Sequence, residues 1–481
     1  MMPFSVYPTG TTIYEPEKCW NGYTVYQLRG AGAILVDMNG RTIRRWRGLK
    51  GFPTSNKIMP GGYIMGSTAP RNPKYGYQDG RDLVQMDWNG KIVWQFQKYE
   101  LVKDPRYQPR WMVRQHHDFQ REGNPVGYYV PKMEPLIDRG NTIIVCHKNL
   151  FNTKISEKRL LDDTFIEVTW NGKITWEWQC SDHFDELGFS EAARNILARD
   201  PNFSQVGGGM GDWMHINSCS LLGPNKWYDS GDKRFHPGNL IWSSRASNIL
   251  AITEKKTGNI IWKVGPDYTA TETLRNLKQI IGPHHVHLIP RGLPGEGNIL
   301  VYDNGGWAGY GAPNEGSPTG RNVALRDYTR VVEFDPITLK IVWQYPQPAA
   351  SPTAIFAGRY SVYSPLMSSA QRLPNGNTLI SEGNSARIIE VTNKGEIVWE
   401  FVNPYQEFGK PLLGIYRAYR IPYEWAPQAE PLPQVAVPRI DNSRFRVPGS
   451  QQLTSNKATG KTGRTEEEDE QLCALPEEAI K

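Results

Sequence analysis

The strongest constraint on this sequence is a hairpin pattern that occurs six times. In each copy an alternating strand enters a turn that is often Asn-Gly, and the strand after the turn ends on a Trp. The six segments are 33–46, 82–96, 165–178, 249–264, 331–345 and 388–401. Alternation of apolar and polar residues on both sides of such a turn is typical of a β-hairpin. A lone hairpin is marginally stable, so six copies indicate a repeat architecture.

The position of the Trp is nearly constant across the repeat. Five copies carry it four residues after the turn, at Trp94, Trp176, Trp262, Trp343 and Trp399, whereas Trp46 falls two residues later. A second strand–turn–strand pattern precedes each hairpin, as in residues 368–383, so each unit holds four strands. Radial packing of four-stranded units is the usual solution. We predict an all-β fold, a six-bladed β-propeller with long inter-strand insertions.

The two ends of the repeat predict how the ring closes. Residues 416–422 resemble another first strand, but no hairpin follows them. We expect this strand to complete the blade begun by residues 22–47, because closure protects an open sheet edge. The propeller should therefore span residues 1–425. Residues 426–481 are Pro-rich and then charged, and we expect a partly disordered tail.

Composition excludes several classes of function. The net charge is +6, and no basic run is interleaved with aromatic residues, so we expect no nucleic-acid partner. No stretch of eighteen apolar residues occurs, so we expect no membrane partner. The five cysteines lack metal-ligand spacing, and no signal peptide is seen at the N-terminus. We therefore expect a cytoplasmic protein with reduced thiols, and a homodimer is left open.

Histidines gather in the column that should face the channel. The first strand of each blade lines the axis of a propeller, so these strands can be aligned on their turns. The aligned column holds Thr54, His117, His215, His284, Ser368 and Tyr416, which includes three of the nine histidines in the chain. The second strands add polar or charged tips at His147-Lys148, Arg245 and Asp303-Asn304. Burying so many polar and charged side chains at one end of a channel costs free energy unless a ligand contacts them. The column and these tips therefore predict a functional site.

Three segments around this column resemble hallmarks of the bacterial arylsulfate sulfotransferases. They are WMVRQHHDF (111–119), DWMHINS with IWSSR (212–218 and 241–245), and GPHHVHLIP with GNILVYDNGG (282–290 and 297–306). The likeness covers roughly residues 20–425. Members of this family transfer a sulfuryl group from an aryl sulfate ester to a phenol through a transient sulfohistidine, without a nucleotide donor.

The resemblance assigns roles to individual residues. It implies that His284 is the nucleophile and that His117, His215, Asn217 and Arg245 surround the transferring sulfuryl oxygens. Tyr416 and Ser368 share the column and are predicted to contact the substrate. Chemistry supports this assignment, because a neutral imidazole attacks electrophilic sulfur and fixed donors stabilise charge on the oxygens. The partners would be an aromatic sulfate and a phenol, with no metal and no cofactor.

Two other classes of function stay open. Pro283-His284-His285 stands where the family usually has Gln-His-Asp, which leaves room for a diverged enzyme. Such an enzyme would use the channel histidines for metal-dependent or acid–base lyase or hydrolase chemistry on an aromatic or anionic substrate. His117, His215 and His284 would then be a ligand set for zinc, manganese or iron. The third class is a non-catalytic scaffold. The polar and charged side chains expected in the channel argue against it.

Overall fold

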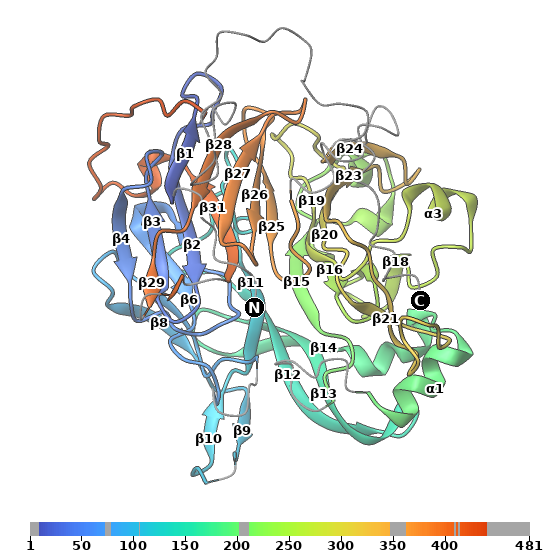
Figure 1. Ribbon diagram of the computed structural model, residues 1–481. Coiled ribbons are helices and arrows are strands. Elements are labelled where there is room, and N and C mark those ends of the chain that lie inside the picture. Colours follow the sequence, from blue (N-terminus) through green and yellow to red (C-terminus); the bar gives the residue numbers. More distant parts are fainter. Residues whose placement is uncertain are drawn as a thin grey trace, which may run out of the picture. The chain divides into compact units, whose positions relative to one another are not determined.

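Six antiparallel sheets form the blades of a propeller, which confirms the predicted fold. The computed structural model describes residues 9–72, 78–104, 106–201, 211–346, 362–407, 410–411 and 414–439. The blades belong to a compact unit that ends at Pro438. In Figure 1 they stand around a common axis, with their first strands innermost. Of the predicted tail, residues 426–439 are described and Val437 pairs with Tyr14, whereas the part beyond Arg439 lies outside the described residues.

Each blade contains four strands in order from the axis outward. The first strands are β5 (Lys57–Met59), β11 (Gln115–Arg121), β15 (Ile216–Leu221), β19 (His284–Leu288), β25 (Ser369–Arg372) and β31 (Ile415–Ile421). The second strands are β6 (Tyr63–Gly66), β12 (Thr142–Asn152), β16 (Leu240–Ser244), β20 (Ile299–Asp303), β26 (Thr378–Glu382) and β2 (Tyr23–Leu28). The third strands are β7 (Leu83–Met86), β13 (Ser156–Val168), β17 (Ile249–Thr253), β23 (Arg330–Phe334), β27 (Arg387–Val391) and β3 (Gly32–Val36). The fourth strands are β8 (Ile92–Phe96), β14 (Ile174–Gln179), β18 (Ile260–Val264), β24 (Ile341–Tyr345), β28 (Ile397–Val402) and β4 (Thr42–Trp46).

One blade is built from both ends of the chain. Strand β31 pairs antiparallel with β2, with Tyr23 opposite Ile421. An additional strand, β1 (Gly10–Tyr14), pairs with β28 and gives the neighbouring blade a fifth strand. These pairings place strands from opposite ends of the chain in two neighbouring blades.

The repeated tryptophans connect each blade to the next. The indole N–H of Trp94 donates to the carbonyl oxygen of Trp170, in the hairpin turn of the following blade, at 2.8 Å. The same bond is made from the other fourth strands by Trp46, Trp178, Trp262, Trp343 and Trp399, which closes a ring of six such contacts. In the third copy Trp176 holds the predicted register, opposite Glu167, but the donor to the next blade is Trp178, two residues later. The repeat therefore encodes contacts between blades as well as within them.

Short strands and helices lie in the loops outside the four-stranded blades. The small strands are β9 (Glu100–Val102), β10 (Arg110–Met112), β21 (Ala308–Tyr310), β22 (Arg321–Ala324), β29 (Gln406–Glu407) and β30 (Lys410–Pro411). The helices are η1 (Pro60–Gly62), η3 (Cys180–Leu187), α1 (Glu191–Arg199), α2 (Lys226–Asp229), η4 (Lys233–Phe235), α3 (Glu272–Leu277) and η6 (Tyr423–Trp425). The predicted helical stretch 183–199 thus divides into η3 and α1, because the Ser190 side chain caps α1 by accepting from the Ala193 N–H.

Most long insertions lie at one end of the propeller. Each first strand starts at the end where the second strand of its blade finishes, because the two are antiparallel. The insertions 97–114, 179–212, 265–282, 305–328 and 346–366 all connect strands at this end. It is also the end at which the histidine column begins. The described parts of these loops therefore lie at the end of the propeller where the histidine column begins.

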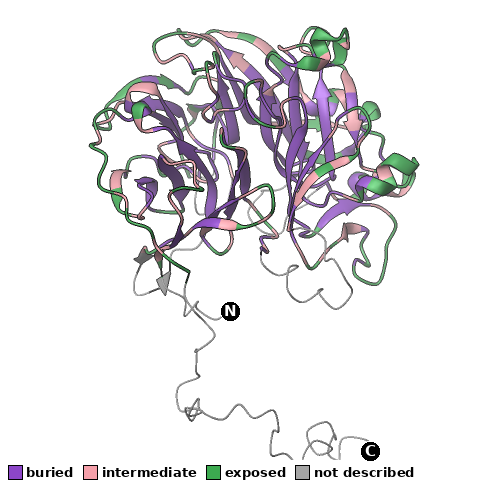
Figure 2. Ribbon diagram, turned by 90° about the horizontal axis from the view of Figure 1, so that it is seen from above, coloured by how far each residue is buried: buried purple, intermediate pink, exposed green. Residues whose placement is uncertain are grey.

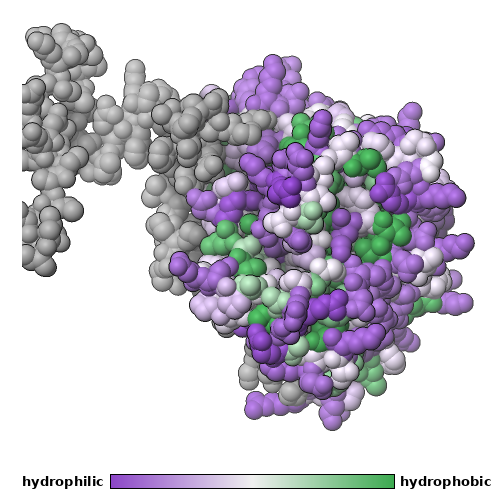
Figure 3. All heavy atoms as spheres, turned by 90° about the vertical axis from the view of Figure 1, so that its right-hand side faces the viewer, coloured by the Kyte–Doolittle hydropathy of each residue, from purple (hydrophilic) through white to green (hydrophobic). Residues whose placement is uncertain are grey.

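The blades are buried and the loops are exposed, as Figure 2 shows. Large apolar residues pack between neighbouring sheets; Trp242 and Trp399, for example, are 0% exposed. The face in Figure 3 is mainly hydrophilic, with scattered apolar side chains. Cys19, Cys146, Cys180 and Cys219 form no disulfide with one another. Within the described residues, no helix is long and apolar enough to cross a membrane.

Candidate functional site

The predicted histidines meet where the first strands of three consecutive blades begin. His117 lies in β11, His215 directly precedes β15, and His284 opens β19. The ring centroids of His117 and His215 are 4.7 Å apart, and Tyr416 of β31 lies 5.4 Å from His117. The three histidines are at most 5% exposed. The fold therefore gathers side chains that are far apart in the sequence.

The ends of the second strands complete this cluster. Arg245 follows β16, and its backbone N–H donates to the carbonyl oxygen of His215 at 3.2 Å. Asn304 follows β20, and its Oδ1 lies 2.7 Å from His284 Nδ1. His147 of β12 stacks on His116 with 3.6 Å between ring centroids. Three of the six blades thus pair a histidine at the start of the first strand with a polar residue in or just after the second strand.

The backbone at these positions explains why neighbouring side chains share one site. His117 and His215 have φ angles of +58° and +54°, and His285, beside His284, has +52°. Non-glycine residues rarely adopt this left-handed conformation, and such residues cluster at functional sites. The register of β11, β15 and β19 is irregular at the same points. Successive side chains therefore no longer alternate strictly between the two faces of the strand. As a result His116 Nδ1 lies 2.7 Å from His117 Nδ1.

The hydrogen bonds of His284 determine which ring nitrogen carries its proton. Asn304 Nδ2 donates to the carbonyl oxygens of Ser364 and Met367 at 2.6 and 2.9 Å, so its Oδ1 faces His284. The carbonyl oxygen of Gly282 also lies 3.1 Å from His284 Nδ1. Because both neighbours are acceptors, Nδ1 carries the proton. The lone pair of the neutral ring is therefore on Nε2.

The surroundings of His284 keep its ring neutral. Burial lowers its pKa well below the usual value of 6.5, and the nearby charge of Arg245 lowers it further. The hydrogen bond to Asn304 acts in the opposite direction but does not reverse the shift. A neutral imidazole is the nucleophilic form. His284 therefore holds the protonation state that attack on an electrophile requires.

His215 is oriented by a carboxylate. Its Nδ1 lies 2.6 Å from Asp212 Oδ2, three residues earlier in the chain. Burial raises the pKa of Asp212 to about 7 and lowers the pKa of His215 to about 3, so the ring is neutral and the carboxyl group holds a proton in part of the molecules near neutral pH. An imidazole held in this way by a carboxylate is suited to moving a proton at its other nitrogen. Asp212 was not singled out by the sequence, although it opens the DWMHINS segment.

Three of the predicted substrate-binding residues, Asn217, Ser368 and Tyr416, are hydrogen-bonded within the fold. Asn217 donates through Nδ2 to the Pro283 carbonyl oxygen at 2.7 Å and accepts from Ser243 Oγ at 3.0 Å. The Ser368 hydroxyl lies 2.9 Å from Ser364 Oγ and accepts from the Gly383 N–H at 3.0 Å. The Tyr416 hydroxyl donates to the Asn217 carbonyl oxygen at 3.0 Å. These three groups are engaged in holding adjacent blades and loops together.

Arg245 has its guanidinium in the cluster, with Nη2 lying 3.5 Å from the Trp307 carbonyl oxygen. Two buried carboxylates, Asp303 and Asp118, are paired with other cations. Asp303 pairs with Arg330 at 2.6 Å and with Arg326 at 2.8 Å. Asp118 pairs with Arg417 at 2.7 Å and with Lys57 at 2.8 Å.

His285 and His287 are buried next to residues of other blades, and the ring centroid of His285 lies 5.7 Å from that of Tyr419 in β31. His285 Nδ1 lies 2.9 Å from the Ala370 carbonyl oxygen, and His287 Nε2 lies 2.9 Å from the Tyr128 hydroxyl. Both rings are at most 1% exposed. Burial lowers the pKa of His287 from 6.5 to about 3, so the folded chain keeps this ring neutral.

This depressed pKa should make the fold sensitive to acid. Below about pH 6.5 the unfolded chain takes up a proton at His287 that the folded chain refuses, so stability falls as pH falls. His287→Gln should reduce the slope of unfolding free energy against pH, between about pH 5 and 6, by about 1.4 kcal/mol per pH unit. Urea unfolding at several pH values measures the slope. His236→Gln, at an exposed histidine, is the control, and an unchanged slope in His287→Gln would contradict the prediction.

The histidines that the sequence suggested as metal ligands, His117, His215 and His284, are not the residues whose donor atoms converge in the structure. Among the described residues, the group whose donor atoms lie close enough to hold a metal ion is His116, His147 and Asp163. It does not include His117, His215 or His284. Asp163 had no assigned role, although a pair of acidic residues beside an apolar strand, in LLDDTFIEV, was a visible signal.

Comparison with solved structures finds distant likenesses. A protein of unknown function from Bacteroides caccae aligns with a TM-score of 0.43 and 11% identity, covering 83% of this chain and 99% of that one. Virginiamycin B lyase from Staphylococcus aureus gives 0.34 and 10%, covering 83% and 86%. The β-propeller domain of Cps50 (Swd1) from Myceliophteria thermophila gives 0.35 and 11%, covering 84% and 88%. No curated protein matches the chain.

The family comparison is informative. Residues 134–405 match the sequence model of the family described as "Arylsulfotransferase (ASST)". The matched region contains His215, Arg245 and His284 but begins after His117. It covers more than half of the 481 residues. The chain therefore belongs to the arylsulfotransferase family.

Proposed function

We propose that this protein transfers a sulfuryl group from an aryl sulfate ester to a phenol through a covalent adduct on His284, without a nucleotide donor. Membership of the family supports aryl sulfotransfer at the level of the reaction class. The observation that carries the finer proposal is the orientation of His284. Asn304 accepts from its Nδ1, so the neutral ring offers the Nε2 lone pair as a nucleophile.

The proposed reaction has two balanced halves. First, Nε2 of His284 forms a bond to sulfur, the bond between sulfur and the aryl oxygen breaks, and the departing phenolate takes up a proton. Second, the acceptor phenol loses a proton as its oxygen bonds to sulfur, and the N–S bond breaks. The nitrogen regains its lone pair, so the enzyme returns to its starting state. No nucleotide or external oxidant enters either half.

Donors around His284 would stabilise the sulfuryl oxygens. Arg245 is close enough to shift the pKa of His284, and its charge suits an anionic ester. The ring of His117 lies 4.7 Å from that of His215, so it too faces the region where the oxygens would lie. Donors held in place before the reaction need no reorganisation when charge develops. Trp307 is 47% exposed beside Arg245 and offers an aromatic face for the substrate.

The His215–Asp212 pair would handle the proton of each half-reaction. In this proposal the pair starts with one proton between Asp212 Oδ2 and His215 Nδ1 and a second proton on His215 Nε2. Nε2 gives its proton to the departing phenolate while the shared proton moves to Nδ1, and in the second half Nε2 takes the proton of the acceptor phenol, which restores the pair. This assignment gives each of the two rings one task. His284 bonds to sulfur, and His215 moves the proton.

Activity can be tested with p-nitrophenyl sulfate as donor and a second phenol as acceptor. Extensively desalted full-length protein should release p-nitrophenol and form the sulfated acceptor in equal amounts, with no nucleotide added. Release of p-nitrophenol together with free sulfate, with no sulfated acceptor, would instead indicate a hydrolase. Absence of both products across a panel of aryl sulfates would reject the proposal.

Replacing Arg245 should weaken catalysis and move its pH dependence. Arg245→Gln removes a donor to the sulfuryl group, so kcat/KM should fall about a hundredfold. It also removes a charge that lowers the pKa of His284, so the ring should become protonated at higher pH than in the wild type. The acid limb of the kcat/KM profile should therefore shift toward higher pH.

A matched control separates charge from structure in this prediction. Arg245→Lys keeps a positive charge and should retain more activity than Arg245→Gln, with a smaller shift of the acid limb. Unfolding curves at neutral pH check that each variant is folded. A normal kcat/KM in Arg245→Gln would remove Arg245 from the proposed site.

A further inference from the structure

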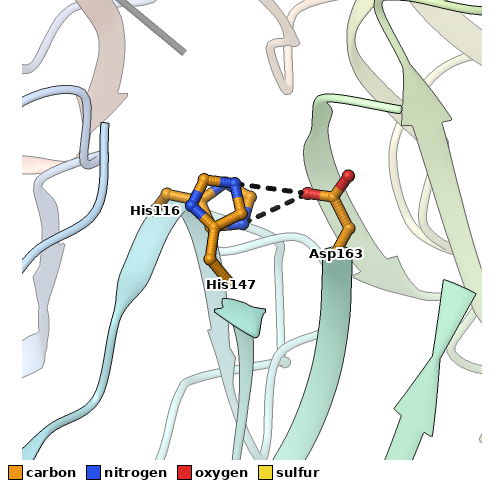
Figure 4. A group of neighbouring side chains, drawn as sticks. All are labelled: His116, His147 and Asp163. Carbon is orange, nitrogen blue, oxygen red and sulfur yellow. Dashed lines mark ion pairs between the residues drawn. The ribbon is translucent and has the colours of Figure 1, made fainter. Parts of the chain in front are cut away.

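Three side chains from adjacent strands of one blade point to a single spot behind the catalytic cluster. His116 of β11, His147 of β12 and Asp163 of β13 converge in Figure 4. Asp163 Oδ1 lies 3.3 Å from His116 Nε2 and 3.7 Å from His147 Nε2. All three side chains are 0% exposed. We propose that they bind one divalent transition-metal ion of the zinc type.

The polar atoms at this spot lack ordinary partners. His116 Nε2, both ring nitrogens of His147 and Asp163 Oδ1 are buried and make no hydrogen bond of ordinary geometry among the described residues, and their contacts with opposite charges are ion pairs at 3.3–3.7 Å. Buried polar groups are nearly always satisfied, and a concentration of exceptions requires an explanation. A cation in contact with the two Nε2 atoms and Oδ1 would satisfy three of these atoms at once.

The donor set selects the class of ion. Two imidazole nitrogens and one carboxylate oxygen suit zinc, iron or cobalt, whereas magnesium and calcium prefer oxygen ligands. Ligands at about 2.0–2.1 Å from a tetrahedral ion lie about 3.3–3.4 Å apart. The two distances to Asp163 Oδ1 are close to that spacing. The rings of His116 and His147 stack at 3.6 Å, so binding should turn them apart to bring the ion into both ring planes.

A second carboxylate is placed to orient His147. Asp79 Oδ2 lies 3.5 Å from His147 Nδ1, on the side of the ring away from Asp163. Arg114 Nε donates to the same Asp79 oxygen at 2.9 Å and holds it in position. A carboxylate at Nδ1 favours a proton there and leaves the Nε2 lone pair for the ion. This is the usual outer arrangement of metal-binding histidines.

The ion would also act on the neighbouring catalytic residue. With Nε2 of His116 bound to metal, the proton of this ring is on Nδ1, which lies 2.7 Å from His117 Nδ1. His117 Nδ1 then accepts, and its own proton is on Nε2. This leaves His117 as a hydrogen-bond donor on its far side. Only this consequence rests on the proposed function, because the metal site itself does not involve His284.

Metal content and affinity test the site directly. Full-length protein treated with a chelator and reloaded with Zn²⁺ should retain one ion per chain after desalting, and Co²⁺ should give the visible absorption of a nitrogen- and oxygen-bound ion. Asp163→Asn and His147→Gln should each weaken Zn²⁺ binding by more than about a hundredfold, since even the loss of outer partners costs about 10–100-fold. Isothermal titration of the stripped protein measures the affinity.

Two controls keep the outcome decisive. His287→Gln changes a buried histidine outside the cluster and should keep the ion, and His284→Asn should keep it as well. Failure of sulfuryl transfer therefore leaves the metal site standing, and the reverse also holds. Circular dichroism identifies variants that fail to fold, and Zn²⁺ should raise the Tm of the wild type but not of Asp163→Asn. No stoichiometric ion in the wild type, or undiminished binding in both ligand variants, would overturn the proposal.

Discussion

His284→Asn should abolish the covalent adduct and lower turnover by about three to six orders of magnitude. Asparagine can keep a polar contact near Asn304 but has no imidazole nitrogen to attack sulfur. Loss of a covalent nucleophile typically has an effect of this size. The wild type, quenched rapidly after mixing with p-nitrophenyl sulfate, should show a sulfuryl adduct on the peptide that contains His284. The variant should show none, while p-nitrophenol release without acceptor should lose its initial burst.

The control for this experiment is His236→Asn. His236 lies in an exposed loop near Tyr228, away from the histidine cluster, so this variant should keep both adduct and turnover. Binding of an unreactive aryl sulfonate should survive His284→Asn better than Arg245→Gln, because Arg245 is proposed to hold the anion. Near-normal turnover in His284→Asn would show that the histidines perform acid–base chemistry and that no sulfohistidine forms.

Arg417→Met should lower the free energy of unfolding by about 3–5 kcal/mol. Arg417 of β31 is fully buried and donates to Asp118 of β11 and to the carbonyl oxygen of Asn217 in β15, each at 2.7 Å. It therefore links the last strand of the propeller to two other blades. Removing one partner of a buried ion pair leaves a charge poorly compensated and has a large cost. Lys57 would remain as the other cation beside Asp118. Urea unfolding at neutral pH measures the loss.

The same substitution at the surface is the control. Arg139→Met removes an ion pair with Asp138 in which both side chains are 69% exposed, and should cost less than about 1 kcal/mol. Adding Asp118→Asn and Lys57→Met to Arg417→Met should recover part of the lost stability, because no buried charge of this group is then left without its partner. A cost of Arg417→Met no larger than that of Arg139→Met would show that this buried pair does not hold the ring closed.

The fold was accessible from the sequence because its signals are local. Each hairpin shows its alternation and turn within about fifteen residues, and the copies follow one another along the chain in the order of the blades. The pairing of β31 with β2 also followed from one unpaired strand pattern near the C-terminus. The choice of Trp178 over Trp176 did not, because both lie in β14 and only contact with the next blade distinguishes them.

The site was predicted in part. His117, His215 and His284 were found because the repeat aligns the starts of the first strands, and a propeller brings these starts together. His116 and Asp163 were missed as members of a cluster because simple alternation turns His116 away from the channel and leaves Asp163 inside a strand. The left-handed backbone at His117 breaks that alternation. Such a local bulge depends on the packing of neighbouring strands and leaves no mark in the hydrophobic pattern.

The sequence by itself determined the number of blades, the strands that form them and the column of histidines at one end. These follow from periodicity and turn chemistry, which act between residues close in the chain. Only the tertiary structure decided which polar groups face one another. It placed Asn304 against His284, Asp212 against His215 and Asp163 against His116 and His147. The reason is that ring orientation and proton position depend on distances of a few tenths of an ångström between blades, which packing alone sets.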